Sequence, residues 1–221
     1  MKKYRSKSPH RIAHPKIWVW SHTEKAEINY FQAFKNNLRS PLLMPDKIIC
    51  RRPQQLIPRV IDWKQKEIND EDGDRVWIIF DVDAFFKTDS QNLLNLINKA
   101  HENNIKIAYV NECFEHWLLL HFERINGPVE RGSAIEAKIN RHFKTKNLGS
   151  YSKNQEVFQA LIPFQDDAIK NAKILVPKYE GIDWEKVLGD EGNPSTTIHF
   201  LIEEINNLLH DNKNIVSCTA G

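Results

Sequence analysis

The chain has 221 residues, of which 41% are hydrophobic and 27% charged, the balance of an ordinary protein with one sizeable core. Its 8 glycines form no G-x-x-x-x-G-K-[ST] or G-x-G-x-x-G motif, which excludes a nucleotide loop of either kind. Net charge is only +2, yet residues 1–16 carry six basic side chains and no acid. We expect a flexible basic arm over residues 1–15, either solvated or in contact with phosphates.

No apolar run approaches the roughly 18 residues that a membrane span requires. The first fourteen residues are polar and basic, unlike a secretory signal. Three cysteines, at widely separated positions, follow no zinc-ligand spacing and fit a reducing compartment. We therefore expect a cytoplasmic protein without a membrane partner.

Strand-like and helical patterns alternate along the first half of the chain. Buried strands are predicted at Lys16–His22, Lys47–Arg51, Arg75–Asp81 and Ile105–Val110. Helical spacing is found at Ile28–Leu38, Leu56–Ile68 and Leu93–Ala100, with breaks at Pro41 and Pro45 and with Pro58 in a first helical turn. This alternation predicts an α/β fold with right-handed βαβ units and a mostly parallel sheet flanked by helices.

The second half is predicted to be mostly helical. Further helices are expected around Phe114–His121, Ser133–Phe143, Asp166–Val176 and Thr196–His210. We expect one domain over residues 16–210, with the sheet core reaching to about residue 123 and a helical part over about 124–210. A frayed tail is expected over 211–221.

Asp81 and Asp83 follow the most strand-like segment of the chain. Residues two apart in a strand point the same way, and open parallel sheets bind ligands at the carboxyl edge. Two carboxylates this close repel each other unless a cation intervenes, and hard oxygen ligands favour Mg²⁺ or Mn²⁺. The simpler alternative is that one aspartate caps the next helix while the other is solvated.

The end of the first strand supplies a second acidic group. Glu24 and Glu27 lie three apart at the start of a helix, and either could complete a three-carboxylate metal site with Asp81 and Asp83. Alternatively, both simply favour the helix dipole behind a Thr23 cap. His22 is a candidate metal ligand or proton carrier, or else a hydrogen-bonded edge residue.

Glu112 and Glu115 follow the fourth strand, at the same edge. Glu115 lies within an apolar run and therefore needs a partner, a cation or a proton. His121 is expected to be packed and hydrogen-bonded rather than catalytic. Candidate phosphate contacts near this edge are Lys25, Arg51, Arg52, Lys87 and Lys153.

Four segments together resemble the RloB-like family, over about residues 16–210. They are Glu24–Phe31 (EKAEINYF), Ile79–Phe85 (IFDVDAF), Asn111–Phe122 (NECFEHWLLLHF) and Asn193–His199 (NPSTTIH). Tyr151–Ser152–Lys153 is similar to a Y-x-K element of that family.

The resemblance implies a Toprim-like, Rossmann-like sheet with a glutamate after strand one and D-x-D after strand three. It also implies metal-dependent phosphodiester cleavage in bacterial anti-phage defence or abortive infection, with an ATPase partner. One departure concerns the first strand end, where His22, Thr23 and Ala26 stand in place of the family's Glu, Gly and Thr. Glu112 stands where the family has proline, which adds a carboxylate near the site.

The leading hypothesis is a Mg²⁺- or Mn²⁺-dependent nuclease acting on RNA, with tRNA one target, or on DNA. Asp81, Asp83 and Glu24 or Glu27 would bind the metal, and Glu115 would orient the site. The alternative is a catalytically altered subunit that binds nucleic acid or the ATPase, which the loss of the first glutamate favours. A phosphatase acting on small molecules is a third hypothesis, and homo-oligomerisation is left open.

Overall fold

The computed structural model describes residues 15–21, 26–48, 50, 52–82, 89–129 and 132–219. Its strands are β1 (Ile17–Ser21), β2 (Leu43–Lys47), β3 (Arg75–Val82), β4 (Ile105–Asn111) and β5 (Ser195–Thr196). The helices of the first half are α1 (Ala26–Leu38), α2 (Pro53–Glu67), α3 (Ser90–Glu102) and α4 (Phe114–Leu120). Those of the second half are α5 (Ser133–Thr145), α6 (Phe158–Leu161), α7 (Gln165–Leu175), α8 (Trp184–Leu188) and α9 (Ile198–Thr219).

The five strands form one sheet in the order β2-β1-β3-β4-β5. The first four are parallel, and only the two-residue β5 runs antiparallel, beside the end of β4. The prediction of an α/β fold with a mostly parallel sheet is confirmed. Because β2 lies on one side of β1 and β3 on the other, the strand order reverses between β1 and β3, a topological switch point.

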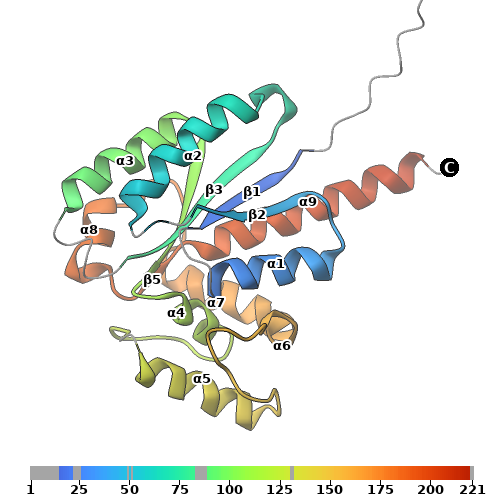
Figure 1. Ribbon diagram of the computed structural model, residues 1–221. Coiled ribbons are helices and arrows are strands. Elements are labelled where there is room, and N and C mark those ends of the chain that lie inside the picture. Colours follow the sequence, from blue (N-terminus) through green and yellow to red (C-terminus); the bar gives the residue numbers. More distant parts are fainter. Residues whose placement is uncertain are drawn as a thin grey trace, which may run out of the picture.

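Helices cover both faces of the sheet (Figure 1). Strand alternation assigns each apolar side chain to one of two cores. In β3, Trp77 and Ile79 pack into the core shared with α1, α4, α7 and α9. In the same strand Ile78 and Phe80 pack into the core shared with α2, α3 and α8. Both faces of β3 are therefore buried, which explains its almost continuous apolar sequence.

The second strand was predicted wrongly, at residues 47–51. The structure places β2 earlier, at Leu43–Lys47, with Pro45 opposite Val19 of β1. Pro45, predicted to break the chain, is tolerated because β2 is an edge strand, where a missing N–H can face away from the ladder. In α2 it is Pro53, not Pro58, that occupies the first turn, and Pro58 lies inside the helix.

The helical second half follows the prediction more closely. The predicted helix at residues 133–143 is α5, which ends two residues later, and the predicted helix at 166–176 is α7, displaced by one residue. The last helix was predicted to fray after His210, but α9 continues to Thr219 and projects beyond the body of the domain (Figure 1). In the part of the chain that the structure describes, no helix is long and apolar enough to cross a membrane.

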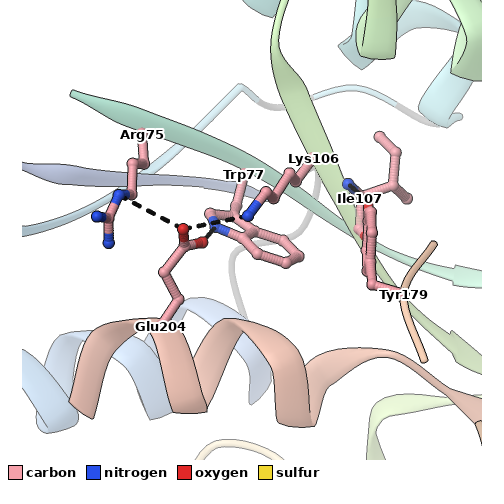
Figure 2. A network of polar contacts seen from close by, with 6 residues as sticks. All are labelled: Arg75, Trp77, Lys106, Ile107, Tyr179 and Glu204. Atoms are coloured by element: carbon pink, nitrogen blue, oxygen red, sulfur yellow. Dashed lines mark hydrogen bonds and ion pairs between the residues drawn. The ribbon is translucent and has the colours of Figure 1, made fainter. Parts of the chain in front are cut away.

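A polar network fastens α9 to the amino edge of the sheet. Glu204 of α9 accepts a hydrogen bond from Trp77 Nε1 at 2.5 Å and pairs with Lys106 at 3.1 Å and Arg75 at 3.5 Å (Figure 2). These three partners come from the first half of β3 and β4. The network therefore lies at the edge opposite the strand ends on which the predicted site residues lie.

Candidate functional site at the carboxyl edge of the sheet

Asp81 lies at the carboxyl end of β3, the central strand, as the sequence predicted. It continues the alternation of Trp77 and Ile79 and therefore points to the face covered by α1 and α4. On the neighbouring strand, Ser21 is aligned with Ile79 and continues the series of Ile17 and Val19 on that same face. Asp81 and Ser21 therefore lie on one face of the sheet, at the switch point between β1 and β3.

Glu27 brings a second carboxylate to this face. It is the second residue of α1, and only 4% of its surface is exposed. The helix packs on the same face through Tyr30, Phe31 and Phe34. The first turn of a helix is a favourable place for a negative charge.

Glu115 brings a further carboxylate to this edge. It lies in the first turn of α4, directly after β4, and is 3% exposed. Its Oε1 accepts a hydrogen bond from the Tyr151 hydroxyl at 3.0 Å and lies 3.1 Å from Lys153 Nζ. The predicted need of Glu115 for a partner is thus met by two residues of the segment after α5.

These contacts determine the charge of Glu115. Burial raises the pKa of its carboxyl group, but the Glu115 backbone amide, the Lys153 ammonium and the Tyr151 hydroxyl together outweigh burial, so the pKa lies below its ordinary value. Burial lowers the pKa of Lys153, but the charge of Glu115 outweighs it and the pKa is raised. Both groups are therefore ionised at neutral pH, and Tyr151, whose pKa is raised by burial and by Glu115, remains a hydrogen-bond donor.

Lys153 also lies 3.6 Å from Glu136 of α5. One lysine is therefore shared by two carboxylates, and its side chain is 44% exposed. The predicted role of Lys153 in binding phosphate is untested, but the structure shows that its charge is engaged by Glu115 and Glu136. This Glu115 cluster, defined as Glu115, Glu136, Tyr151 and Lys153, carries a net charge of −1.

The two histidines of the α4 region are structural. His116 Nδ1 lies 2.8 Å from the Asn111 carbonyl oxygen, and His121 Nδ1 lies 3.0 Å from the Trp117 carbonyl oxygen. Burial lowers the pKa of each to about 4, so both are neutral at physiological pH. The prediction that His121 is packed and hydrogen-bonded is confirmed.

Several predicted site residues lie outside the described part of the chain. These are His22, Glu24, Lys25, Arg51, Asp83 and Lys87, together with the basic arm. Arg52 is described, and it is exposed immediately before α2. Of the predicted metal ligands, Asp81 and Glu27 are described, and no group of three or more His, Cys, Asp or Glu side chains suited to a metal occurs among the described residues.

Sequence reasoning named Glu115, Tyr151 and Lys153 separately but did not join them. Tyr151 and Glu115 are 36 residues apart in the chain, and no spacing rule connects a helix start to a distant loop. Glu136 was missed altogether. Its one sequence signal is an acidic residue in the first turn of α5, a position that favours glutamate in any helix.

The fold and this edge define a class of protein: a mostly parallel α/β domain with carboxylates gathered where the strand order reverses. The model of the family described as RloB-like protein matches residues 17–205. The chain belongs to the RloB-like family. No curated protein and no solved structure matches the chain.

Proposed function

We propose that this RloB-like protein is a divalent-metal-dependent nuclease whose reaction takes place at the carboxyl edge of β1 and β3. The observation that carries the proposal is the position of Asp81 and Glu27. Asp81 is the next-to-last residue of β3, and Glu27 begins the helix that follows β1; both lie on the face covered by α1 and α4, beside the switch point. Open α/β sheets bind their ligands at such a point.

The donor set suits a hard cation. Asp81 and Glu27 offer carboxylate oxygens, the ligands that Mg²⁺ and Mn²⁺ prefer. Asp81 and Glu27, with Asp83 and Glu24 from the adjoining segments, are the residues that would hold the ion.

A bound ion would supply an activated water and neutralise the charge that develops on a phosphodiester. The protein's own residues would then position the substrate. The Glu115 cluster holds the start of α4 at the edge of the sheet. Arg52, exposed before α2, would contribute a further phosphate contact.

The substrate, the cellular role and the partner are also proposals. The resemblance to the RloB-like family supports RNA, including tRNA, or DNA as substrate, a role in anti-phage defence and an ATPase partner. The Toprim-like description of the sheet is supported by a D-x-D motif at the end of the third strand in the chain, since Asp81 is the next-to-last residue of β3. A catalytically altered subunit that only binds nucleic acid or the ATPase is the alternative.

The test is cleavage of labelled tRNA, single-stranded RNA and DNA by the full chain with Mg²⁺ or Mn²⁺, and with EDTA. Asp81→Asn removes one charge without changing the size of the side chain. Because a catalytic metal contributes several kcal/mol, we expect Asp81→Asn to cleave on the order of 100-fold more slowly. The matched control is Asp167→Asn, an exposed carboxylate on α7, which should cleave at the wild-type rate.

Equal cleavage by wild type and Asp81→Asn would remove the strand end from the mechanism. No cleavage of any substrate, combined with metal-independent binding of RNA or DNA, would favour the binding subunit instead. Calorimetric titration with Mn²⁺ separates these results, because the nuclease proposal requires binding that Asp81→Asn weakens.

A further inference from the structure

Helix α5 carries the most positive net charge of the helices that the structure describes. It contains one acid, Glu136, and three bases, Lys138, Arg141 and Lys144, for a net charge of +2 with histidine counted as neutral. The next most basic helix, α2, has a net charge of +1. Positive charge is therefore concentrated on α5, which lies at the periphery of the domain beyond α4 (Figure 1).

The three bases share the outer face of this helix. The inner face carries the buried apolar residues, Ile135, Ile139 and Phe143. On the opposite side of the helix, Lys138, Arg141 and Lys144 follow one another at intervals of three residues, and all are exposed. Each interval corresponds to about 4.5 Å along the helix axis, so the three cations form a row about 9 Å long.

Arg124 adds a fourth cation beside the row. It is exposed in the segment after α4, and together with Lys138 it lines a surface depression of about 490 Å³. Glu123 also lines this depression, but its carboxylate lies 2.9 Å from His142 Nε2 and is engaged there. We define the α5 cationic face as these four residues: Arg124, Lys138, Arg141 and Lys144.

The α5 cationic face is not neutralised by the described part of the chain. None of its four cations forms an ion pair with a described residue. Bases elsewhere are paired, as Lys173 is with Glu203 at 2.6 Å and Lys106 with Glu204 at 3.1 Å. Like charges three or four residues apart on a helix repel each other and weaken it. A bound anion would offset that repulsion.

The side chains around these cations indicate which kind of anion fits. The other exposed positions on the outer face of α5 are Ala134, Ala137 and Thr145. A helix that lies on a membrane presents large apolar side chains, and a protein interface has an apolar or aromatic centre. The large hydrophobic side chains that are exposed in the described part of the chain are Ile162 and Ile174, and neither belongs to α5. A row of cations without apolar neighbours is the arrangement that a phosphate backbone requires.

Helix α5 is fastened beside the candidate site. Asn140 Oδ1 accepts a hydrogen bond from the Tyr151 amide at 2.8 Å, and Asn140 Nδ2 donates one to the Tyr151 carbonyl at 3.2 Å. Glu136 lies 3.6 Å from Lys153. Tyr151 and Lys153 in turn contact Glu115 at the start of α4. A strand held on the outer face of α5 would therefore lie close to the carboxyl edge of the sheet.

We propose that the α5 cationic face binds the phosphate backbone of RNA or DNA and holds the strand beside that edge. The inference rests on the proposed function for its ligand, and it adds an anchoring surface that does not touch the reacting phosphate. One strand of a duplex carries a phosphate about every 3.4 Å of its axis, so the row on α5 can contact two or three phosphates. Such contacts position a strand without reading its sequence.

The test is the salt dependence of binding, measured in EDTA by fluorescence anisotropy with the full chain and labelled single-stranded RNA and DNA of mixed sequence. The variant Lys138→Gln/Arg141→Gln/Lys144→Gln removes the row. Each phosphate contact to a single strand contributes about 0.7 to the slope of log K against log salt, so the slope should become shallower by about 2. Between about 50 and 200 mM salt, the wild type should then lose affinity about 20-fold more than the variant. Complete loss of binding by the variant at low salt would equally support the proposal.

The matched control is Arg59→Gln/Lys66→Gln/Lys99→Gln. It also removes two exposed lysines and one exposed arginine, but from α2 and α3, which cover the other face of the sheet. Net charge falls equally in both variants, so an effect of overall charge would appear in both. The control should keep the wild-type slope, and an equal loss of slope in the two variants would overturn the proposal.

A charge-preserving variant guards against a loss of binding through misfolding. Lys138→Arg/Arg141→Lys/Lys144→Arg changes the same positions but keeps every charge, so it should bind with the wild-type slope. A loss of slope here would show that charge is not what these positions supply, and would overturn the proposal. Removing like charges relieves repulsion, so the Tm of the glutamine variant should not fall below that of the wild type.

Failure of this proposal and failure of the nuclease proposal are distinguishable. Binding that depends on the α5 cationic face, without cleavage when Mg²⁺ or Mn²⁺ is added, would leave the anchoring surface standing and remove the nuclease. Cleavage by a protein whose salt slope is unchanged in the glutamine variant would do the reverse. A wild type that binds neither RNA nor DNA in EDTA would overturn the anchoring surface, because its cations need no metal to hold phosphates.

Discussion

The two edges of the sheet each anchor a carboxylate with a lysine and an aromatic donor, but with opposite balances of charge. At the amino edge, one carboxylate, Glu204, forms ion pairs with Lys106 and Arg75 and accepts a hydrogen bond from Trp77 (Figure 2). At the carboxyl edge, one cation, Lys153, forms ion pairs with Glu115 and Glu136, and Tyr151 donates a hydrogen bond to Glu115.

The charge balance distinguishes the two edges. The amino-edge network carries a net charge of +1 and joins α9 to β3 and β4, which is a structural role that requires no bound ligand. The Glu115 cluster carries −1 and lies at the same edge as Asp81 and Glu27. Like charges gathered as they are at the carboxyl edge are stabilised by a cation. The comparison therefore predicts different responses of the two edges to mutation, metal and pH.

The largest effect on stability is expected from Lys153→Met, which leaves Glu115 buried without its cation. Loss of one partner costs about 3–5 kcal/mol in a fully buried pair. Because Lys153 is 44% exposed, we expect a loss of about 1–3 kcal/mol in the free energy of unfolding. Urea denaturation measures it. The double variant Glu115→Gln/Lys153→Met should recover part of the loss, and additive losses would show that the pair is not coupled.

A smaller effect is expected from Glu204→Gln at the amino edge. The amide oxygen can still accept from Trp77, and both cations are about half exposed, so the loss should be about 1 kcal/mol or less and should shrink in high salt. Binding of Mn²⁺ should be unchanged in this variant. A loss of metal binding comparable with that of Asp81→Asn would contradict the assignment of the two edges to different roles.

The smallest effect is expected from pH. The pKa of Glu115 lies below its ordinary value in the folded protein, so the unfolded chain takes up a proton first as the medium becomes acidic. The stabilisation is complete above about pH 4.3, the unfolded value, and is lost as pH falls towards the folded value. Glu115→Gln should flatten that part of the curve of unfolding free energy against pH. An unchanged slope would show that Glu115 is not held ionised by its partners.

Prediction from sequence worked where one residue pattern has one structural meaning. Residues 76–80 are apolar on both faces, and the structure places them in the central strand with helices on either side. The second strand was predicted at the wrong residues, because residues 47–51 look more strand-like than a segment that contains Pro45. Only the position of β2 at the edge of the sheet makes that proline acceptable.

The role of Tyr179 could not be predicted in the same way. Its hydroxyl accepts a hydrogen bond from the Ile107 amide and donates one to the Ile107 carbonyl, 72 residues away in the chain. Which backbone groups a tyrosine hydroxyl meets depends on the segments that pack against it, so this role exists only in the folded chain.

The sequence by itself determined the alternation of strands and helices, the mostly parallel sheet and the carboxylates that follow its strands, because periodicity and strand-end position are local properties. The tertiary structure alone decided that β1 and β3 lie side by side at a switch point. It also decided that Lys153 and Tyr151 meet Glu115. Electrostatic and hydrogen-bonding partners are chosen by distance in space, and a chain that folds back on itself brings together residues whose separation in sequence carries no information about that distance.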